Sequence, residues 1–282
     1  MSTPDPQAAL NRCAESKQLA RSVRLDILEM VYLARASHVG SCFSIVDALA
    51  VLYARVMNVR ANEPDWPGRD RFILSKGHAA AAVYATLANI GMLPRADLES
   101  YGADGSLYMT HVSHKIAGVE FSTGSLGHGL PFGVGKALAG KRGGHPWRVF
   151  VMLSDGEMDE GSNWEALMFG AHHRLDNLVA IVDYNKLQSL TSISQTLGLE
   201  PLVDKLQAFG WAVREVDGHD HEALALALSS APWSAGRPSV LLTHTIKGKG
   251  VSFMENKVEW HYRSPSAEQL ASARAELMQH HA

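Results

Sequence analysis

The pattern of apolar positions changes along the chain from a helical period to short continuous runs. Helical spacing covers residues 11–36 and 45–56, before any run that is typical of a strand. Shorter segments follow, and two of them, 149–153 and 178–182, are continuous apolar runs, typical of strands buried on both faces. The predicted strands are residues 71–74, 148–153, 178–182, 211–216 and 239–243. The predicted helices near or between them are residues 129–139, 164–173, 202–209 and 222–228.

Alternating strands and helices indicate an α/β fold with a mainly parallel sheet and helices on both faces. A chain of 282 residues, 46% of them hydrophobic, can bury one large core, and no repeat divides it. We therefore expect a single domain over residues 1–282. Residues 61–69 and 102–118 lack periodicity and are expected to be loops. Long irregular loops in compact domains are often functional.

Composition narrows the classes of partner. A net charge of −3 without blocks of like charge gives no indication of nucleic acid or of a membrane surface as a partner. No apolar stretch reaches the length expected of a bilayer span, and the N-terminus lacks the layout of a secretory signal. The two cysteines, Cys13 and Cys42, form no CxxC pair, which suits a reducing compartment. We expect a cytoplasmic protein in which Cys42 is buried.

Polar side chains follow two of the predicted strands. An acidic segment comes directly after residues 148–153, and its carboxylates are Asp155, Glu157, Asp159 and Glu160. Asn185 follows the next predicted strand, 30 residues after Asp155, which is about the length of one βαβ unit. The carboxyl ends of parallel strands form the edge at which open α/β sheets bind ligands. We therefore expect Asp155 and Asn185 to lie close together at that edge.

The residue types at this edge predict a cation and a phosphate. Carboxylate, amide and backbone carbonyl oxygens suit Mg²⁺ or Ca²⁺, and Mg²⁺ often completes its coordination with phosphate oxygens and water. Gly156 has no Cβ to obstruct a bulky anion. The helix expected after Gly161 points its N–H groups toward the same place. The alternative is a solvated acidic helix terminus, but the matching position of Asn185 favours a binding site.

These residues belong to an ordered set of motifs that resembles the transketolase family. The acidic segment and Asp183-Tyr184-Asn185-Lys186-Leu187-Gln188 resemble the thiamine-diphosphate motif of that family. Other segments resemble the family in the expected order, namely Ser75-Lys76-Gly77-His78, Ser122-Thr123-Gly124-Ser125-Leu126-Gly127, Asp217-Gly218-His219-Asp220 and Ile246-Lys247-Gly248-Lys249-Gly250. Together they cover only the diphosphate-binding half of the family's proteins. The chain therefore resembles the N-terminal subunit of a split transketolase.

The resemblance implies a thiamine-diphosphate-binding fold and a set of ligand contacts. A metal ion would be held by Asp155, Asn185 and the backbone carbonyl of Leu187, and it would neutralise the diphosphate of the cofactor. Leu126 would pack on the aminopyrimidine ring. The full set of cofactor contacts that the resemblance implies is His78, Gly124, Ser125, Leu126, Gly156, Glu157, Asn185 and His261.

The resemblance also implies catalytic residues. Histidines would line the channel above the cofactor, bind sugar hydroxyls and help to move protons, and these are His38, His78, His111 and His261. Glu160 would face a subunit boundary and help to link two cofactor sites.

Some neighbours depart from the family's pattern. Val39 and Val112 stand where proline is usual after a histidine, and Tyr262 stands where a small residue is usual. His128 and Lys247 are expected to act from the surface or from behind the residues that contact the cofactor.

The implied reaction depends on thiamine diphosphate and Mg²⁺ and transfers a two-carbon ketol unit from a ketose or ketose phosphate to an aldose. The glutamate that activates the cofactor is expected on a pyrimidine-binding C-terminal subunit, so the implied assembly is α₂β₂. Two alternatives remain open. One is another thiamine-diphosphate enzyme subunit, similar to deoxyxylulose phosphate synthase, and the other is a non-catalytic regulatory subunit that binds the cofactor.

Overall fold

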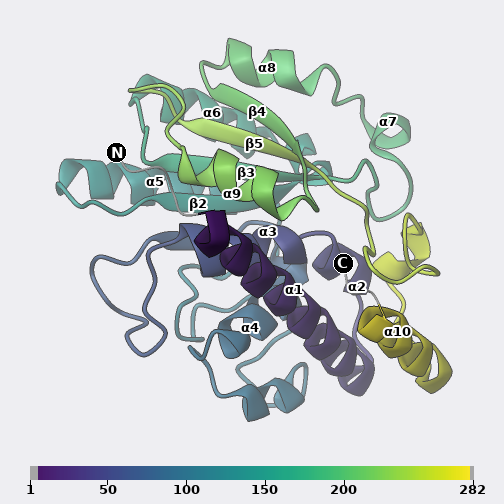
Figure 1. The fold of residues 1–282 in the computed structure, drawn as a ribbon. Helices are drawn as coiled ribbons and strands as arrows, with labels where there is room; N and C mark the ends of the chain where they lie inside the picture. Colours follow the sequence, from purple (N-terminus) through teal and green to yellow (C-terminus); the bar gives the residue numbers. More distant parts are fainter. Residues whose placement is uncertain (1–5, 280–282) are drawn as a thin grey trace.

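A parallel five-stranded sheet forms the centre of the protein in the computed structural model, which describes residues 6–279. The strand order is β1-β2-β3-β5-β4 (Figure 1). The strands are β1 (Arg71–Leu74), β2 (Val149–Ser154), β3 (Leu178–Tyr184), β4 (Ala212–Asp217) and β5 (Ser239–His244). The predicted parallel α/β fold is confirmed, and the ends of each expected strand are correct to within two residues.

Helices cover both faces of this sheet. The α-helices are α1 (Pro6–Ala34), α2 (Val39–Phe43), α3 (Val46–Val51), α4 (Ala80–Asn89), α5 (Gly129–Arg142), α6 (Gly161–His172), α7 (Ile193–Thr196), α8 (Leu202–Ala208), α9 (His221–Ser229) and α10 (Ala267–Gln279). Shorter helical turns are η1 (Leu52–Val56), η2 (Gly77–Ala79), η3 (Arg95–Ser100), η4 (Gly156–Asp159) and η5 (Val258–His261). Figure 1 shows α1 and α4 below the sheet and α8 above it.

Two hydrophobic cores lie on opposite faces of the sheet. Along β2, Phe150 and Met152 belong to the core shared with α1, α3, α4 and α9. Val149 and Val151 belong to the core shared with α5, α6 and α8. Because successive side chains of a strand point to opposite faces, a strand that is apolar at every position is covered on both sides.

Apart from the short helix α7, which was not predicted, the helices differ from the prediction in three main places. The single helix expected over residues 45–56 is divided into α3 and the π-helical turn η1, and the separate helix α2 precedes them. Helix α4 was not predicted, because the residues from Ala80 to Ala88 are all buried and no polar face marks a helical period. Helix α10 was not predicted either, because it buries only Ala273 and Leu277.

The apolar segment Val39–Val56 corrects the expectation that no stretch could span a bilayer. It is a helical stretch of 18 residues with a mean hydropathy of 1.6, which meets that requirement by length and composition. However, 83% of it is buried inside the fold, as in the core helix of a globular protein. Within this segment Cys42 is buried as expected, and both Cys42 and Cys13 are free thiols.

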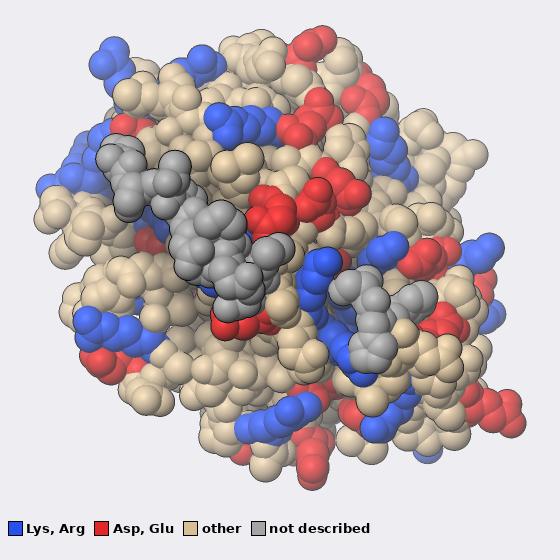
Figure 2. All heavy atoms as spheres, in the orientation of Figure 1, with Lys and Arg blue, Asp and Glu red and all other residues tan. Residues whose placement is uncertain are grey.

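Figure 2 shows acidic and basic side chains intermixed over the face toward the viewer. The residues that matter for chemistry gather instead at one edge of the sheet. The register pairs Ser154 of β2 with Asp183 of β3, and Tyr184 of β3 with His244 of β5. The segments that follow β1, β2, β3 and β5 therefore leave the sheet at the same edge.

Candidate active site

A cavity of about 260 Å³ opens at this edge of the sheet. The predicted site residues that line it are His38, His78, His111, Gly124, Leu126, Asp155, Gly156, Asn185, Leu187 and His261. Residues more than 200 positions apart in sequence, such as His38 and His261, thus meet in one place. Of the predicted set, Ser125, Glu157 and Glu160 do not line this cavity.

Asp155 lines the cavity and is only 1% exposed. Its Oδ1 accepts a hydrogen bond from the Gly156 N–H at 2.8 Å, and its Oδ2 accepts one from the Lys186 N–H. Burial, together with the nearby charge of Asp183, raises the pKa of Asp155 to about 7. The buried ion pair at this edge involves Asp183 rather than Asp155. A buried carboxylate without a paired cation is costly, so the position suits a cation.

Asn185 and Leu187 add neutral oxygen atoms to the same cavity. The Asn185 amide is oriented at both ends, because its Nδ2 donates to Asp183 and its Oδ1 accepts from the Leu187 N–H. No group of three or more His, Cys, Asp or Glu side chains within the described residues is placed to hold a metal ion. The predicted set has one carboxylate, so it would depend on the amide and carbonyl oxygens for its remaining protein ligands.

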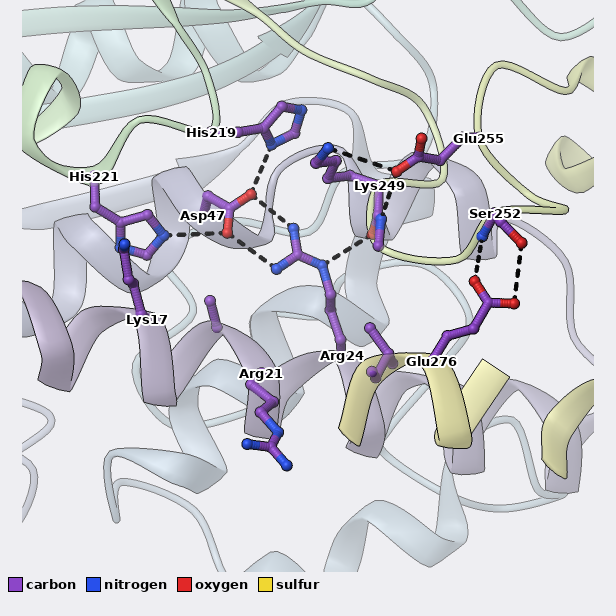
Figure 3. Close-up of a pocket in the computed structure, with 13 residues that line it drawn as sticks. Lys17, Arg21, Arg24, Asp47, His219, His221, Lys249, Ser252, Glu255 and Glu276 are labelled. Carbon is purple, nitrogen blue, oxygen red and sulfur yellow. Dashed lines mark hydrogen bonds and ion pairs between the residues drawn. The ribbon is translucent and has the colours of Figure 1, made fainter. Parts of the chain in front are cut away.

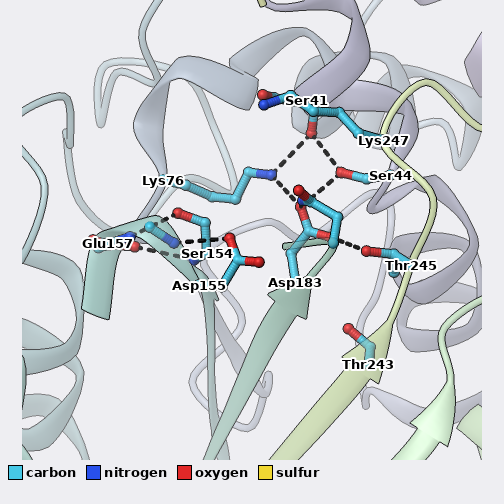
Figure 4. A network of polar contacts seen from close by, with 12 residues as sticks. Ser41, Ser44, Lys76, Ser154, Asp155, Glu157, Asp183, Thr243, Thr245 and Lys247 are labelled. Carbon is cyan, nitrogen blue, oxygen red and sulfur yellow. Dashed lines mark hydrogen bonds and ion pairs between the residues drawn. The ribbon is translucent and has the colours of Figure 1, made fainter. Parts of the chain in front are cut away.

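Lys76 and Asp183 form a buried ion pair beside Asp155 (Figure 4). Their side chains are 1% and 0% exposed, and Lys76 Nζ lies 2.6 Å from Asp183 Oδ2. Asp183 also accepts a hydrogen bond from the Ser44 hydroxyl at 2.6 Å and one from Thr245. Although burial opposes ionisation, the lysine and these hydroxyls keep the pKa of Asp183 low. The pair thus connects the segment after β1 and strand β3 to α2 and to Ser44, which lies between α2 and α3.

Lys247 also lines the cavity, and its burial corrects only the surface position that was one of the two expectations for it. It is 2% exposed, and its Nζ donates to the carbonyls of Leu187 at 3.2 Å and Gln188 at 3.1 Å. Its third contact is His261 Nδ1, at 3.1 Å. Burial, and then the charge of Lys76, lowers the pKa of Lys247 to about 8. The ammonium group therefore remains mainly charged at neutral pH beside a cavity that could take an anion.

The segment that carries Lys247 is connected to the buried carboxylate of Asp47 through His219 and Arg24 (Figure 3). His219 Nδ1 lies 2.6 Å from Asp47 Oδ2, and His219 Nε2 accepts the Ile246 N–H at 2.8 Å. Arg24 pairs with Asp47 at 2.7 Å and donates through Nε to the Lys249 carbonyl at 3.1 Å. A larger cavity of about 550 Å³ adjoins this network, but it contains none of the predicted site residues.

The predicted histidines form one cluster. The distances between ring centroids are 5.1 Å for His38 and His78, 5.8 Å for His38 and His111, 5.0 Å for His38 and His261, and 5.4 Å for His78 and His261. Burial is the main cause that lowers the pKa of all four, to about 4 for His38 and about 3 for His261. The imidazoles are therefore neutral at pH 7, and each can both donate and accept a hydrogen bond.

His38 occupies its place through an unusual backbone conformation. Its φ of 76° lies in the left-handed region, which few residues other than glycine adopt. Its N–H donates to the His261 carbonyl at 2.9 Å, so the two histidines are tied together through the backbone. Such conformations cost on the order of 1–3 kcal/mol and are concentrated at functional sites.

Glu157 differs from the predicted direct contact with a cofactor. It is fully buried, and its Oε1 accepts from the Ser75 hydroxyl at 2.5 Å and from the Gly127 N–H at 2.9 Å. It thereby holds the loop that brings Gly124 and Leu126 to the cavity. Burial raises the pKa of this carboxyl.

The other two predicted residues outside the cavity are exposed. Ser125 lies in the same loop, where its carbonyl contacts His128 Nδ1 at 3.2 Å. Glu160 stands directly before α6. Neither side chain lines the cavity, so any role of Ser125 or Glu160 depends on a group that binds to the exposed surface of this chain.

Comparison with known proteins identifies this architecture. The family described as the thiamine diphosphate binding domain of transketolase matches residues 15–281. The chain belongs to the transketolase family. It is 40% identical to an apulose-4-phosphate transketolase subunit of Phocaeicola vulgatus, over 90% of each chain. It is 41% identical to a 6-deoxy-6-sulfo-D-fructose transketolase subunit of a Clostridium species, over 92% of this chain and 94% of that one.

Solved structures confirm the fold. The transketolase of Leishmania mexicana superposes with a TM-score of 0.88 at 31% identity, over 93% of this chain. The chain spans 41% of that transketolase, whereas it matches the subunits of split transketolases over about nine tenths of their length. The expected likeness to an N-terminal transketolase subunit with a thiamine-diphosphate-binding domain is thus confirmed.

Proposed function

We propose that this chain transfers a two-carbon ketol unit from a ketose or ketose phosphate to an aldose, as the N-terminal subunit of a two-subunit transketolase. The observation that carries the proposal is a single cavity lined by both a buried carboxylate, Asp155, and four neutral histidines. Membership of the transketolase family supports it.

The residues of the cavity fit thiamine diphosphate with Mg²⁺ or Ca²⁺. Asp155, Asn185 and the Leu187 carbonyl would hold the cation, and the raised pKa of Asp155 reflects a buried charge that a cation would stabilise. The ammonium group of Lys247 suits the charge of a diphosphate. A Cβ on Gly156 would lie 2.9 Å from Gln188 Cγ, so glycine lets the backbone of this segment pack closely against Gln188 at the cavity. When bound, thiamine diphosphate supplies the nucleophilic carbon that carries the two-carbon unit.

The histidines would bind the sugar and move protons. Because Lys247 can only donate, His261 Nδ1 is the acceptor of their contact, and the neutral ring carries its proton on Nε2. That N–H can donate to a hydroxyl or carbonyl oxygen of the sugar. His38, His78 and His111 lie within one cluster with it and would act as neutral donors and acceptors for the remaining hydroxyls.

We further propose an α₂β₂ assembly with a C-terminal, pyrimidine-binding chain that supplies the glutamate for cofactor activation. Relatives that are named as single subunits of a transketolase imply such a partner. Glu160 is exposed before α6, and Met168 and Phe169 expose apolar side chains on that helix. These features suit a contact between α6 and a second chain, where Glu160 would face the boundary.

The substrates and the cellular location are also part of the proposal. The relative from Phocaeicola vulgatus is named for a sugar phosphate, and the relative from a Clostridium species is named for a sugar with a sulfo group. We propose sugars or sugar phosphates as substrates, and neither nucleic acid nor a membrane as a partner. A cytoplasmic location is supported by the two free cysteines, Cys13 and Cys42.

The test uses the complex of this chain with its C-terminal subunit. Ketol transfer between sugars supports the proposal, pyruvate consumption would favour the enzyme similar to deoxyxylulose phosphate synthase, and tight cofactor binding without turnover would favour a regulatory subunit. Calorimetry should show that Asp155→Ala abolishes Mg²⁺-dependent binding of thiamine diphosphate. Asp204→Ala, which removes an exposed carboxylate on α8, is the matched control. Unchanged affinity in Asp155→Ala would remove the assigned metal site.

A further inference from the structure

Tyr262 stands at the opening of the cavity, directly after the turn η5. Its ring centroid lies 4.8 Å from that of His261 and 6.5 Å from that of His38. The residue is nevertheless 57% exposed, so part of the ring faces the histidines and part faces outward. Among the described residues that line the cavity, it is the one with a phenol ring.

Hydrogen bonds position the backbone of Tyr262 relative to the histidines. The Tyr262 N–H donates to the Glu259 carbonyl at 3.1 Å, and its carbonyl accepts from the Ser37 hydroxyl at 3.2 Å. Ser37 directly precedes His38, whose own N–H is bonded to the His261 carbonyl. The backbone of Tyr262 is therefore bonded to the segments that carry two catalytic candidates, His38 and His261, and it does not belong to an independent loop.

We infer that Tyr262 is a specificity-determining residue whose ring contacts the part of the ketose donor beyond the cleaved bond. This inference rests on the proposed function. The reacting carbons must lie among the histidines, because these are the groups that can move their protons. The rest of the sugar must then extend toward the opening, past Tyr262.

An aromatic ring is well suited to that position. Its face offers a large apolar surface for the C–H groups of a sugar chain, and its hydroxyl can bond a sugar hydroxyl at the edge. A donor with only three carbons leaves nothing for the ring to contact. The site is therefore built for ketoses of five or more carbons over such short donors.

The experiment compares donors in the complex of this chain with its C-terminal subunit. Hydroxypyruvate is the short donor, because only carbon dioxide leaves beyond the two-carbon unit, and ketose phosphates of five and six carbons are the long donors. Tyr262→Ala should lower kcat/KM for the long donors by about tenfold, mainly through KM, since the lost contact exists before and during the reaction. Its kcat/KM for hydroxypyruvate should stay near the wild-type value. Tyr262→Phe should retain most of the preference for long donors.

Leu226→Ala, at an exposed leucine of α9, is the control and should change neither value. An equal loss with all donors would show that Tyr262 only supports His261, and it would overturn the inference. An unchanged or increased preference for long donors in Tyr262→Ala would overturn it as well. If the wild-type complex transferred no ketol unit from any donor, the proposed function itself would fail, and with it the basis for the inference.

Discussion

The substitution Asp155→Asn should stabilise the metal-free protein at pH 8 while it removes metal binding. The pKa of Asp155 is raised from 3.8 to about 7 in the folded protein. Between these values the folded protein holds a proton that the unfolded chain has released, so the free energy of unfolding falls as the pH rises from about 4 to 7. Above that range the loss approaches roughly 4 kcal/mol, at 1.36 kcal/mol per pKa unit.

Asparagine removes this penalty but not without cost. The carboxylate accepts N–H groups from both Gly156 and Lys186, and asparagine offers an oxygen to only one of them. The N–H left opposite its amide costs about 1–3 kcal/mol. The net gain at pH 8 is therefore roughly 1–3 kcal/mol, which corresponds to several degrees in the thermal midpoint.

Thermal unfolding in EDTA at pH 5.5 and pH 8 measures this effect. We compare the thermal midpoint of the variant with that of the wild type at each pH. Subtracting the difference in midpoint at pH 5.5 from the difference at pH 8 cancels the titration of all other groups. The result should be positive. Saturating Mg²⁺ and thiamine diphosphate should then raise the midpoint of the wild type alone, since a bound ligand adds about 2.7 kcal/mol at 100 times its Kd. A variant that is less stable than the wild type at pH 8 by the same amount as at pH 5.5 would refute this explanation of Asp155.

Three further predictions concern the histidines and the buried ion pair. His78→Ala should lower kcat by about 10²–10⁴-fold, with little change in the thermal midpoint, as steady-state kinetics and calorimetry would show. Lys76→Met leaves Asp183 buried without its cation, and denaturant unfolding should show a loss of about 3–5 kcal/mol, whereas a loss below 1 kcal/mol would contradict the role of the pair. Because the pKa values of His38 and His261 are about 4 and about 3, protonation of these rings should cause no fall in kcat between pH 8 and pH 5, which a pH–rate profile would test.

The sequence predicted the sheet well because four of the five strands are buried almost throughout, and the fifth, β4, is only partly buried. The apolar runs nevertheless end before the hydrogen-bonded ladder does. Strand β3 continues to Tyr184 and β5 continues to His244, because neighbouring strands still pair there. The polar residues at the end of a strand thus belong to the hydrogen-bonded sheet and also contribute side chains to the site. A pattern of hydrophobic residues alone does not reveal this.

Two lysines are among the side chains that the sequence failed to place. Lys76 and Lys247 both stood in the motifs, yet a lysine is usually exposed. Their burial depends on partners that are distant in sequence, such as Asp183 for Lys76 and the Leu187 carbonyl for Lys247. The resemblance to a family identified the segments, but only the folded chain shows which of their side chains turn inward.

The contact between Lys247 and Leu187 leads to a last prediction, which concerns the order in which ligands bind. The carbonyl oxygen that the lysine ammonium now contacts at 3.2 Å is the one assigned to the metal ion. Two cations repel each other at such a distance, so a metal ion on this oxygen should displace the ammonium group. A diphosphate would attract both and offer the lysine a new partner.

Mg²⁺ alone should therefore bind the wild-type chain weakly, and Mg²⁺ and thiamine diphosphate should each strengthen the binding of the other by the same factor. Lys247→Met should bind Mg²⁺ alone more tightly than the wild type and the diphosphate less tightly, so that the coupling between the two ligands decreases. Calorimetric titration of each ligand with and without the other, on both proteins, measures all four affinities. If Lys247→Met bound Mg²⁺ alone no more tightly than the wild type does, the lysine and the metal ion would not compete for the Leu187 carbonyl.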